Sequence, residues 1–267
     1  MVEEIYKMEN LEFSYGKNRV IKGINVSIKK GDFVGIIGPN GSGKSTFVKI
    51  LTKILQNYKG NVFFKGTELK KISLPQLSKD VSFLPSSINV YFPYTVFEFV
   101  LMGRYPHLSK FEKIRVADYE IVEEVLEKLG IKKLSNKKLF ELSEGERQFV
   151  FLAQLFAQKT EVIILDEPIS HLDIGHEFKI MDILEKYNEK GITIITILHN
   201  LNISSEYSKC IFLFKDGKIL KEGKVEEVID YKTIEEAYET KVIVHKNPFS
   251  GKPYVFGIPE KFLKTNC

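Results

Sequence analysis

The chain has 267 residues, of which 43% are hydrophobic and 28% charged, and a chain of this length can bury one large core or two modest ones. Its 39 basic and 35 acidic residues give a formal net charge of +4, and because the lysines are scattered among glutamates the pattern argues against a nucleic-acid partner. No apolar run approaches the roughly 20 residues that a bilayer-spanning helix needs, and the N-terminal MVEEIYKMEN lacks the layout of a signal peptide, so we expect a cytosolic protein that reaches a membrane only through another protein.

The N-terminal region is predicted to combine short strands with one helix. LEFSY (11–15) and INVSI (24–28) are expected to pair as antiparallel strands around a turn at 17–19. DFVGIIG (32–38) is almost wholly apolar, as a buried central strand is. Residues 45–55 carry apolar side chains at helical spacing, which predicts a helix directly after that strand.

The strongest chemical signal is GPNGSGKST (38–46), at the junction of this strand and helix. Glycines let backbone N–H groups turn inward around a phosphate, and the helix N-terminus adds its positive end. Lys44 is predicted to reach the β- and γ-phosphates of ATP and the Ser45 hydroxyl to ligate Mg²⁺. A chance glycine-rich turn is the alternative, which the correctly placed strand and helix disfavour. The predicted nucleotide-binding residues are Gly38, Pro39, Asn40, Gly41, Ser42, Gly43, Lys44, Ser45 and Thr46.

The second half of the chain alternates between helical and strand patterns. EIVEEVLEKLG (120–130) and AQLFAQ (153–158) are the clearest helices in a Glu- and Lys-rich region. Strands resume at 161–168, 192–200 and 209–220. This alternation favours an α/β protein with a largely parallel sheet that a helical insert interrupts.

An acidic partner for the phosphate loop stands in VIILDEP (162–168). The four apolar residues form a buried strand that carries Asp166 to its end, where it is predicted to hold the Mg²⁺ shell. Glu167 follows directly and is placed to accept a proton from water as a general base. An acidic pair that merely ends a strand is the alternative explanation.

LSEGERQ (142–148) resembles the LSGGQ signature of the nucleotide-binding subunits of ATP-binding cassette (ABC) transporters, and the resemblance covers nearly the whole chain. In that family the signature of one subunit closes over ATP held by the phosphate loop of a second. The resemblance therefore implies that Ser143 and Gly145 contact the γ-phosphate in trans. Glu144 replaces the usual glycine and Glu146 the usual glutamine. A helix cap followed by a first-turn glutamate would also explain the segment.

Three smaller segments are similar to further motifs of the family. SHLD (170–173) resembles the loop that crosses the dimer interface, with Asp173 as its acid. His199 resembles the switch histidine that contacts the γ-phosphate and the attacking water, and Tyr15 the aromatic residue that stacks on adenine. Taken alone, His199 would be interpreted as a structural histidine and Tyr15 as an ordinary strand tyrosine.

The segment FLPSS (83–87) departs from the family pattern. In the family the strand before it, here 81–84, ends in LPQ, and the glutamine amide reaches Mg²⁺ or the attacking water. Ser86 stands in the glutamine position and is shorter by about two bonds, so it is predicted to reach the metal only through a water. Ser87 or Asn89 is the alternative ligand if the loop shifts.

The resemblance implies an α/β fold: a P-loop NTPase core with an antiparallel β lobe and an inserted α-helical subdomain. The whole chain, 1–267, is interpreted as one ABC ATPase domain. Within it, 1–86 and 159–240 are predicted to form the catalytic α/β core, 87–158 the helical subdomain with the signature, and 241–267 a C-terminal extension.

Subfamily features point to a transporter type. VLMGRYPHLS (100–109), HNLN (199–202) and the tail at 242–259 are similar to ATPases of iron-siderophore, haem and vitamin B12 importers, although molybdate importers share much of the spelling. YFPYTVFEF is expected to combine both environments, with Tyr91 to Tyr94 partly exposed as a groove for a permease helix; packing of the whole segment in the core of the helical subdomain is the alternative.

The implied function is an ATP hydrolase of the translocase type that dimerises on ATP and powers import of a metal chelate. Its cofactors are ATP and Mg²⁺, and its partners are a second copy or a second ABC subunit, transmembrane permease subunits and, indirectly, an extracytoplasmic substrate-binding protein. It would sit peripherally at the cytoplasmic face of the cell membrane.

Other functions remain open on the sequence alone. A soluble ABC-type ATPase that uses dimer closure for assembly or signalling is the first alternative, and a degenerate nucleotide-binding regulator, favoured only by Ser86 and Glu144, is the second. Cys210 and Cys267 are far apart without metal-ligand spacing and are expected to be free thiols.

Overall fold

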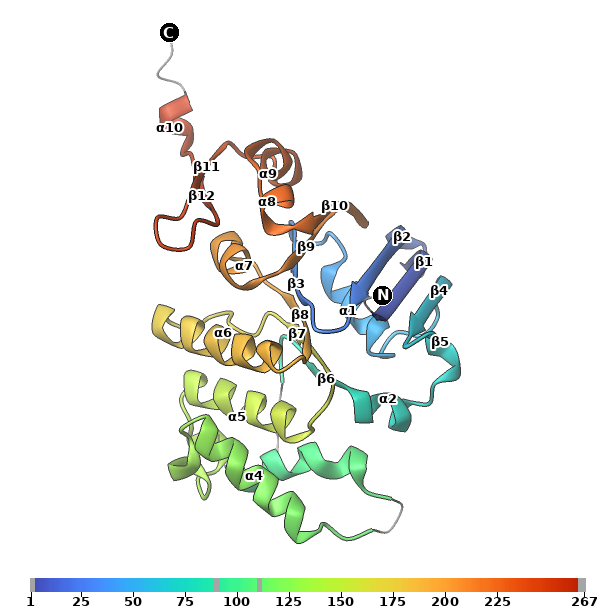
Figure 1. Ribbon diagram of the computed structural model, residues 1–267, viewed down its shortest axis with the longest axis vertical. Coiled ribbons are helices and arrows are strands. Elements are labelled where there is room, and N and C mark those ends of the chain that lie inside the picture. Colours follow the sequence, from blue (N-terminus) through green and yellow to red (C-terminus); the bar gives the residue numbers. More distant parts are fainter. Residues whose placement is uncertain (1–2, 89–91, 110–111, 264–267) are drawn as a thin grey trace. The chain divides into compact units, whose positions relative to one another are not determined.

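The computed structural model describes residues 3–88, 92–109 and 112–263 of the chain (Figure 1). Residues 1–71 together with 193–267 form one compact unit, here the first unit, and residues 72–192 form the second. The ranges predicted above for the core, helical subdomain and extension stay predictions. Within the described ranges, no helix has both the length and the apolar character needed to span a bilayer.

The first unit contains a four-stranded antiparallel sheet in the order β2-β1-β4-β5. Tyr15 pairs with Asn18, so the turn between β1 and β2 consists of Gly16 and Lys17, one residue earlier than predicted. Both strands are also longer than predicted, because pairing continues through charged residues such as Arg19, which forms an ion pair with Glu12. The strands are β1 (Glu4–Tyr15), β2 (Asn18–Lys29), β4 (Lys59–Phe64) and β5 (Thr67–Glu68), with the 3-10 turn η1 (Leu69–Lys71) after them.

The parallel strands of the first unit are almost wholly buried. β3 (Phe33–Ile37) pairs in parallel with β8 (Thr193–Ile197) on one side and β9 (Cys210–Lys215) on the other. β10 (Lys218–Lys224) pairs antiparallel with β9. Every residue of β3 and β8 is buried, which explains their apolar composition and confirms the prediction of a buried central strand.

Helix α1 (Lys44–Leu51) follows β3 and is shorter than predicted. The hydroxyl of Thr52 donates to the Val48 carbonyl at 3.0 Å, and Lys53 has a φ of 58°. A left-handed residue stops an α-helix, so residues 52–55 continue the helical spacing of the sequence without continuing the helix.

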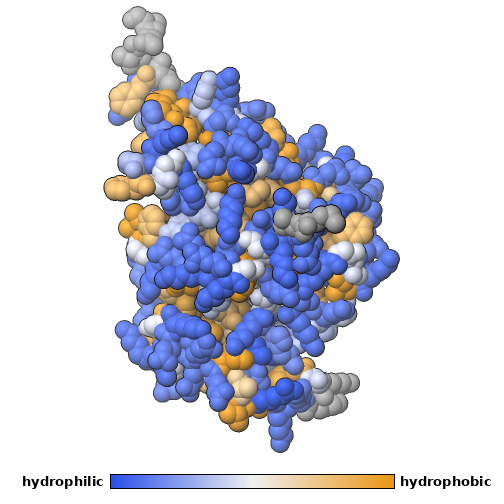
Figure 2. All heavy atoms as spheres, viewed as in Figure 1, coloured by the Kyte–Doolittle hydropathy of each residue, from blue (hydrophilic) through white to orange (hydrophobic). Residues whose placement is uncertain are grey.

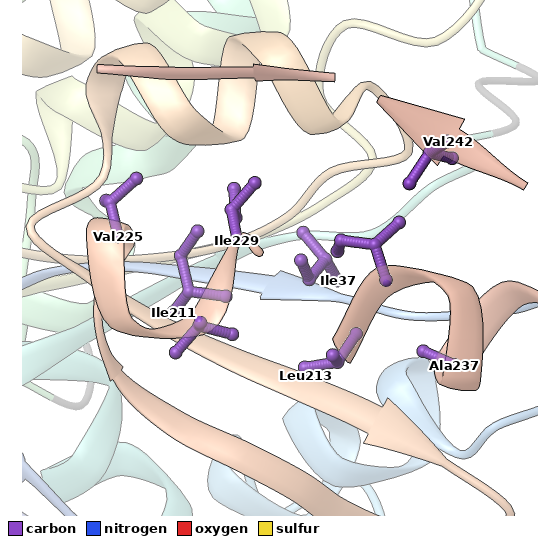
Figure 3. Packing of buried hydrophobic residues seen from close by; sticks show 9 residues of the cluster. Ile37, Ile211, Leu213, Val225, Ile229, Ala237 and Val242 are labelled. Carbon is purple, nitrogen blue, oxygen red and sulfur yellow. The ribbon is translucent and has the colours of Figure 1, made fainter. Parts of the chain in front are cut away.

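The C-terminal segment of the first unit packs around the end of β3. Figure 3 shows Ile37 of β3 in one apolar cluster with residues from β9 and from the elements that follow it. The elements after β10 are α8 (Val225–Val228), α9 (Tyr231–Tyr238), β11 (Val242–Lys246), β12 (Pro253–Gly257) and α10 (Glu260–Leu263). Of these, α8, α9 and β11 contribute buried residues to the cluster, and Val255 of β12 packs against it. The buried members of the cluster are Ile37, Ile211, Leu213, Val225, Val228, Ile229, Ile234, Ala237 and Val242.

The β11–β12 hairpin is fastened to α7 (Leu201–Tyr207) by polar side chains. The Asn202 amide donates to the Val255 carbonyl at 3.2 Å and accepts from the Val255 N–H at 2.7 Å. The Ser205 hydroxyl donates to the Pro253 carbonyl. Beyond this attachment the tail exposes apolar side chains, with Phe249 98% exposed, and Figure 2 shows hydrophobic residues gathered at that end of the chain.

The second unit combines two parallel strands with helices. β6 (Val81–Leu84) and β7 (Val162–Asp166) pair in parallel, with Leu84 opposite Leu165, so their carboxyl ends lie at the same edge. The helices are α2 (Leu74–Asp80), α3 (Val96–Leu101), η2 (Met102–His107), α4 (Val116–Lys128), η3 (Lys132–Leu134), η4 (Leu139–Glu141), α5 (Glu144–Ala157) and α6 (Ile174–Glu189).

The GRYPH segment, 103–107, ties η2 to α4 and α5. Arg104 forms a buried ion pair with Asp118 at 2.8 Å and donates to the Ala157 carbonyl at 2.7 Å. A His107 ring nitrogen lies 2.6 Å from the Gln158 carbonyl. A Cβ added at Gly103 would lie 2.2 Å from the Gln154 carbonyl oxygen, so the close approach requires glycine there. This segment, a subfamily feature of the sequence, therefore has the structural role of joining η2 to α4 and α5.

Replacing Asp118 with alanine is expected to destabilise the protein by roughly 3 kcal/mol, because it leaves the Arg104 guanidinium buried without its carboxylate. Arg104 and Asp118 are 8% and 5% exposed. The Arg104 hydrogen bond lowers the pKa of Asp118. The pair therefore contributes stability above the ordinary aspartate pKa of about 4 and loses it as the pH falls through the lowered value.

Urea unfolding of parent and variant at pH 7 and at acidic pH measures both effects. Glu124→Gln, which removes an exposed partner of Lys128, is the control and is expected to change stability little. An Asp118→Ala protein as stable as the parent at pH 7 would contradict the assigned role.

Candidate nucleotide site

The phosphate loop joins β3 to α1 in the first unit, and its glycines occupy conformations that other residues avoid. Gly38, Gly41 and Gly43 have φ values of 141°, 76° and 102°. A Cβ at Gly38 would lie 2.2 Å from the Phe214 carbonyl oxygen, and one at Gly43 would lie 2.9 Å from Ile21 Cδ1. Glycine is therefore required at both ends of the loop by the structure itself.

Lys44 folds back over the loop. Its Nζ donates to the carbonyl oxygens of Gly38 and Pro39, each at 2.8 Å, and the residue is 5% exposed. Ser45 and Thr46 follow in the first turn of α1, which contains no acidic residue. A positive helix end and a buried ammonium group beside turned-in backbone are the features that bind the phosphates of a nucleotide.

The backbone of the loop is anchored from outside. Gly38 donates its N–H to the Tyr238 hydroxyl at 2.9 Å, and the Gly217 N–H donates to the Ser42 carbonyl at 3.1 Å. Burial raises the pKa of Tyr238 to about 12, so this phenol stays neutral. A cavity of about 210 Å³ lies against the loop, lined by Pro39, Asn40, Gly41, Ser42, Lys215, Asp216, Ala237, Tyr238 and Glu239. No sequence pattern points to Tyr238, which is 200 residues from Gly38 along the chain.

Two further predicted residues of the first unit are accessible. Tyr15 ends β1, is 49% exposed and contacts Phe13 edge-on at 4.9 Å between ring centroids. His199 is exposed between β8 and α7. The next residue, Asn200, caps α7 by accepting from the N–H groups of Asn202 and Ile203, so asparagine preserves the helix start at this position.

Asp166 and Glu167 lie at the end of β7 in the second unit. Asp166 is the last residue of the strand and is 1% exposed. Glu167 is half-buried, has a φ of 57°, and accepts a hydrogen bond from the Ser170 hydroxyl at 3.2 Å. A glutamate in the left-handed region is strained, and such residues concentrate at functional sites.

Ser86 follows the neighbouring strand, β6, by two residues and is exposed. It therefore lies at the same strand edge as Asp166.

The alternative ligand Asn89, and Tyr91 of the predicted groove, fall outside the described residues, as does Cys267. Phe92 is 68% exposed. Cys210 is a free, half-buried thiol, and burial raises its pKa to about 11.

Ser143 is the N-cap of α5. Its hydroxyl accepts from the Glu146 N–H at 3.2 Å, and its own N–H donates to the Glu146 carboxylate at 3.0 Å. The Ser143 N–H is the main cause of the lowered pKa of Glu146. The helix-cap explanation is therefore correct as local structure, and it leaves Ser143, Glu144 and Gly145 together on an accessible helix N-terminus.

Asp173 is the N-cap of α6 and accepts from the His176 N–H at 3.0 Å. That bond is the main cause of the lowered pKa of Asp173. Helix α5, which begins after Ser143, is joined to the loop after Glu167, because the Gln148 amide donates to the Pro168 carbonyl at 2.6 Å. His176 and Gln148 were not among the predicted site residues. His176 lies outside every motif, and Gln148 ends the signature segment LSEGERQ, for which roles were assigned only to Ser143 and Gly145.

Comparison with known proteins shows which family the chain belongs to. The sequence model of the ABC transporter family matches residues 21–170. The iron(3+)-hydroxamate import ATP-binding protein FhuC of Bacillus subtilis is 34% identical over 92% of this chain and 91% of its own length. The ferric enterobactin transport ATP-binding protein FepC of Escherichia coli is 33% identical over 96% of this chain and 95% of its own length.

Solved structures of ABC transporters have a similar fold. A transporter in an inward-facing conformation, described as of the metal-chelate ABC type, has a TM-score of 0.85 at 22% identity over 97% of this chain and 99% of that chain. A dimeric bacterial ABC transporter cassette has a TM-score of 0.74 at 27% identity over 82% of this chain and 98% of that chain. The predicted α/β P-loop fold with an antiparallel sheet and a helical subdomain is confirmed. With the family model matching more than half of its length, the chain belongs to the ABC transporter family and is an ATP-hydrolysing subunit of that family.

Proposed function

We propose that this subunit dimerises on ATP at the cytoplasmic face of a membrane and powers uptake of an iron chelate through a permease. The observation that carries the proposal is the similarity to iron-chelate import ATPases over more than 90% of both chains. The GRYPH segment and the tail, which are similar to those of such importers, are joined to α5 and α7 by specific hydrogen bonds. A soluble ABC ATPase gains no such support.

The nucleotide is proposed to bind by its phosphates to the first unit. Lys44 would exchange its two loop carbonyl partners for the β- and γ-phosphates, and the backbone N–H groups of Gly41 and Gly43 would donate to phosphate oxygens. Thr46 belongs to the same helix start. Tyr15 would offer its exposed ring to adenine, a contact that needs only a π-face.

A magnesium ion is proposed to bind together with the nucleotide. Mg²⁺ takes hard oxygen ligands and is usually held by one or two protein groups together with phosphates and waters, and Ser45 and Asp166 supply a hydroxyl and a carboxylate. Ser86 would contribute through a water. When bound, the ion would neutralise charge that develops on the phosphates.

Hydrolysis is assigned to Glu167 and His199. Glu167 would accept the proton of the attacking water, and its bond from Ser170 would hold the carboxylate in one orientation. His199 would contact the γ-phosphate and the same water. Ser143, Gly145 and Asp173 would act on ATP bound to the partner copy, with the N-terminus of α5 directed at its γ-phosphate.

Uptake by reconstituted vesicles tests this function. With the permease in the membrane, this subunit and ATP inside, and a substrate-binding protein outside, ferric hydroxamate labelled with radioactive iron is expected to accumulate. The Glu167→Gln subunit is the control and is expected to abolish accumulation. Vesicles that take up only a sugar or an amino acid would refute the proposed substrate class.

Replacing Ser86 with glutamine is expected to raise ATP turnover about tenfold at unchanged ATP affinity, because a longer amide adds one direct ligand and one oriented dipole, worth roughly 1 to 2 kcal/mol. Steady-state phosphate release measures the rate. Asn89→Ala is the companion variant. If Asn89 holds the ligand role instead, Asn89→Ala is the slow enzyme and Ser86→Gln brings no gain.

A further inference from the structure

We propose that His176 is a positioning residue that fixes Asp173 against the first turn of α5, so that Asp173 and the signature residues reach the partner's ATP as one rigid group. This inference rests on the roles proposed above for Ser143, Gly145 and Asp173. His176 belongs to none of the motifs from which those roles were assigned.

One edge of the His176 imidazole contacts Asp173. Nδ1 lies 2.5 Å from Asp173 Oδ2, while the His176 backbone N–H donates to Oδ1 at 3.0 Å. A single residue therefore engages both oxygens of the carboxylate. The Gly175 backbone N–H also donates to Asp173. Because the Asp173 side chain is 67% exposed, the imidazole adds a side-chain contact to these backbone bonds and restrains Oδ2.

Other atoms of the same ring contact the signature segment. A Cβ added at Gly145 would lie 3.2 Å from Nε2 and 3.3 Å from Cδ2 of His176, so the ring occupies the space beside Gly145 that a larger side chain would enter. The ring also meets Phe149, one turn further along α5, with centroids 5.9 Å apart in an edge contact. The imidazole thus bridges Asp173 and the first two turns of α5.

A second tie makes the bridge rigid. The Gln148 amide, on the same part of α5, donates to the Pro168 carbonyl at 2.6 Å. Two separate contacts therefore hold α5 to the segment 168–176, and that segment begins directly after Glu167. Two points of attachment fix the direction of the start of α5 relative to the segment 168–176. A single hydrogen bond would still let the helix pivot.

The consequence for turnover follows from geometry. A misplacement of about 1 Å at a catalytic site costs up to about 100-fold in rate, and loss of the imidazole removes only one of the two ties. His176→Ala is therefore expected to lower kcat about tenfold. The KM for ATP is expected to change little, because the phosphate loop that holds the nucleotide is on a different segment.

Mixed dimers with differently tagged chains test the inference. In the first pair one chain carries Lys44→Ala and the other His176→Ala, so the only working phosphate loop faces an intact signature, and about half of the parental turnover is expected. In the second pair both substitutions lie on one chain beside a parental chain. The working loop then faces the altered signature, and turnover about tenfold lower than in the first pair is expected.

Equal turnover in the two pairs would overturn the inference, since a general loss of stability does not depend on which chain carries the substitution. The same pairs made with Ser143→Arg calibrate the assay. If Ser143→Arg also shows no dependence on arrangement, the proposed shared site fails, and the inference fails with it. If Ser143→Arg shows the dependence and His176→Ala does not, only the inference fails.

Conservative variants give a second readout. His176→Asn places an N–H donor near the position of Nδ1 and is expected to recover most of the turnover that His176→Ala loses. Equal loss in both would overturn the contact with Asp173 as the cause. His245→Ala, which removes an exposed imidazole from β11, is the matched control and is expected to leave ATP hydrolysis unchanged.

Discussion

Glu167→Gln is expected to slow ATP hydrolysis by about 100-fold or more while ATP affinity is retained, because loss of a general base typically costs that much. Glutamine has the same shape and its amide oxygen still accepts from Ser170, so the loop after β7 is expected to keep its conformation. Single-turnover phosphate release gives the rate, and nucleotide titration gives the affinity.

The stalled Glu167→Gln protein is also expected to accumulate as an ATP-bound dimer, which size-exclusion chromatography with light scattering detects. Glu185→Gln, an exposed carboxylate on α6, is the matched control and is expected to hydrolyse ATP at the parental rate. Unchanged turnover in purified Glu167→Gln would remove Glu167 from the role of base.

Ser143→Arg is expected to abolish hydrolysis with little loss of ATP binding by the monomer. The long cationic side chain replaces a small hydroxyl at the start of α5 and, in the proposed shared site, would block approach of the partner's γ-phosphate, while the phosphate loop of the same chain is untouched. The substitution also removes a helix cap, at a cost of about 1 kcal/mol. Turnover and nucleotide titration measure the two effects separately.

A matched cap variant separates the lost cap from the lost contact. Ser73 caps α2 by accepting from the Gln76 N–H at 3.3 Å, and Ser73→Arg is expected to reduce stability similarly but to keep hydrolysis. Mixing Ser143→Arg with Lys44→Ala chains is expected to restore about one working site per mixed dimer. The absence of any restored activity would count against a site shared between two chains.

The parts of the site that depend on local sequence were predictable. The phosphate loop needs only an apolar strand, glycines at fixed spacing and a helix start, and all three stand within about 20 consecutive residues. Asp166 and Glu167 were predictable for the same reason, since the buried residues before them define the strand. The family motifs then implied roles that local chemistry leaves open.

Contacts between distant segments were not predictable. The hydroxyl of Tyr238 under Gly38, the bridge from His176 to Gly145 and the pair of Arg104 with Asp118 join residues whose neighbours in sequence carry no matching pattern. Strand ends were missed for a different reason. β1 and β2 continue through charged residues because backbone pairing does not require apolar side chains.

The cluster in Figure 3 has a consequence for the order of folding during synthesis. Ile37 leads into the phosphate loop, yet its buried neighbours come from residues 211–242. Contacts of such high sequence separation form late, since a long chain must close on itself first. When only the N-terminal half of the chain has left the ribosome, the residues that support the phosphate loop have not yet been made. We therefore expect nucleotide binding to be acquired near the end of translation.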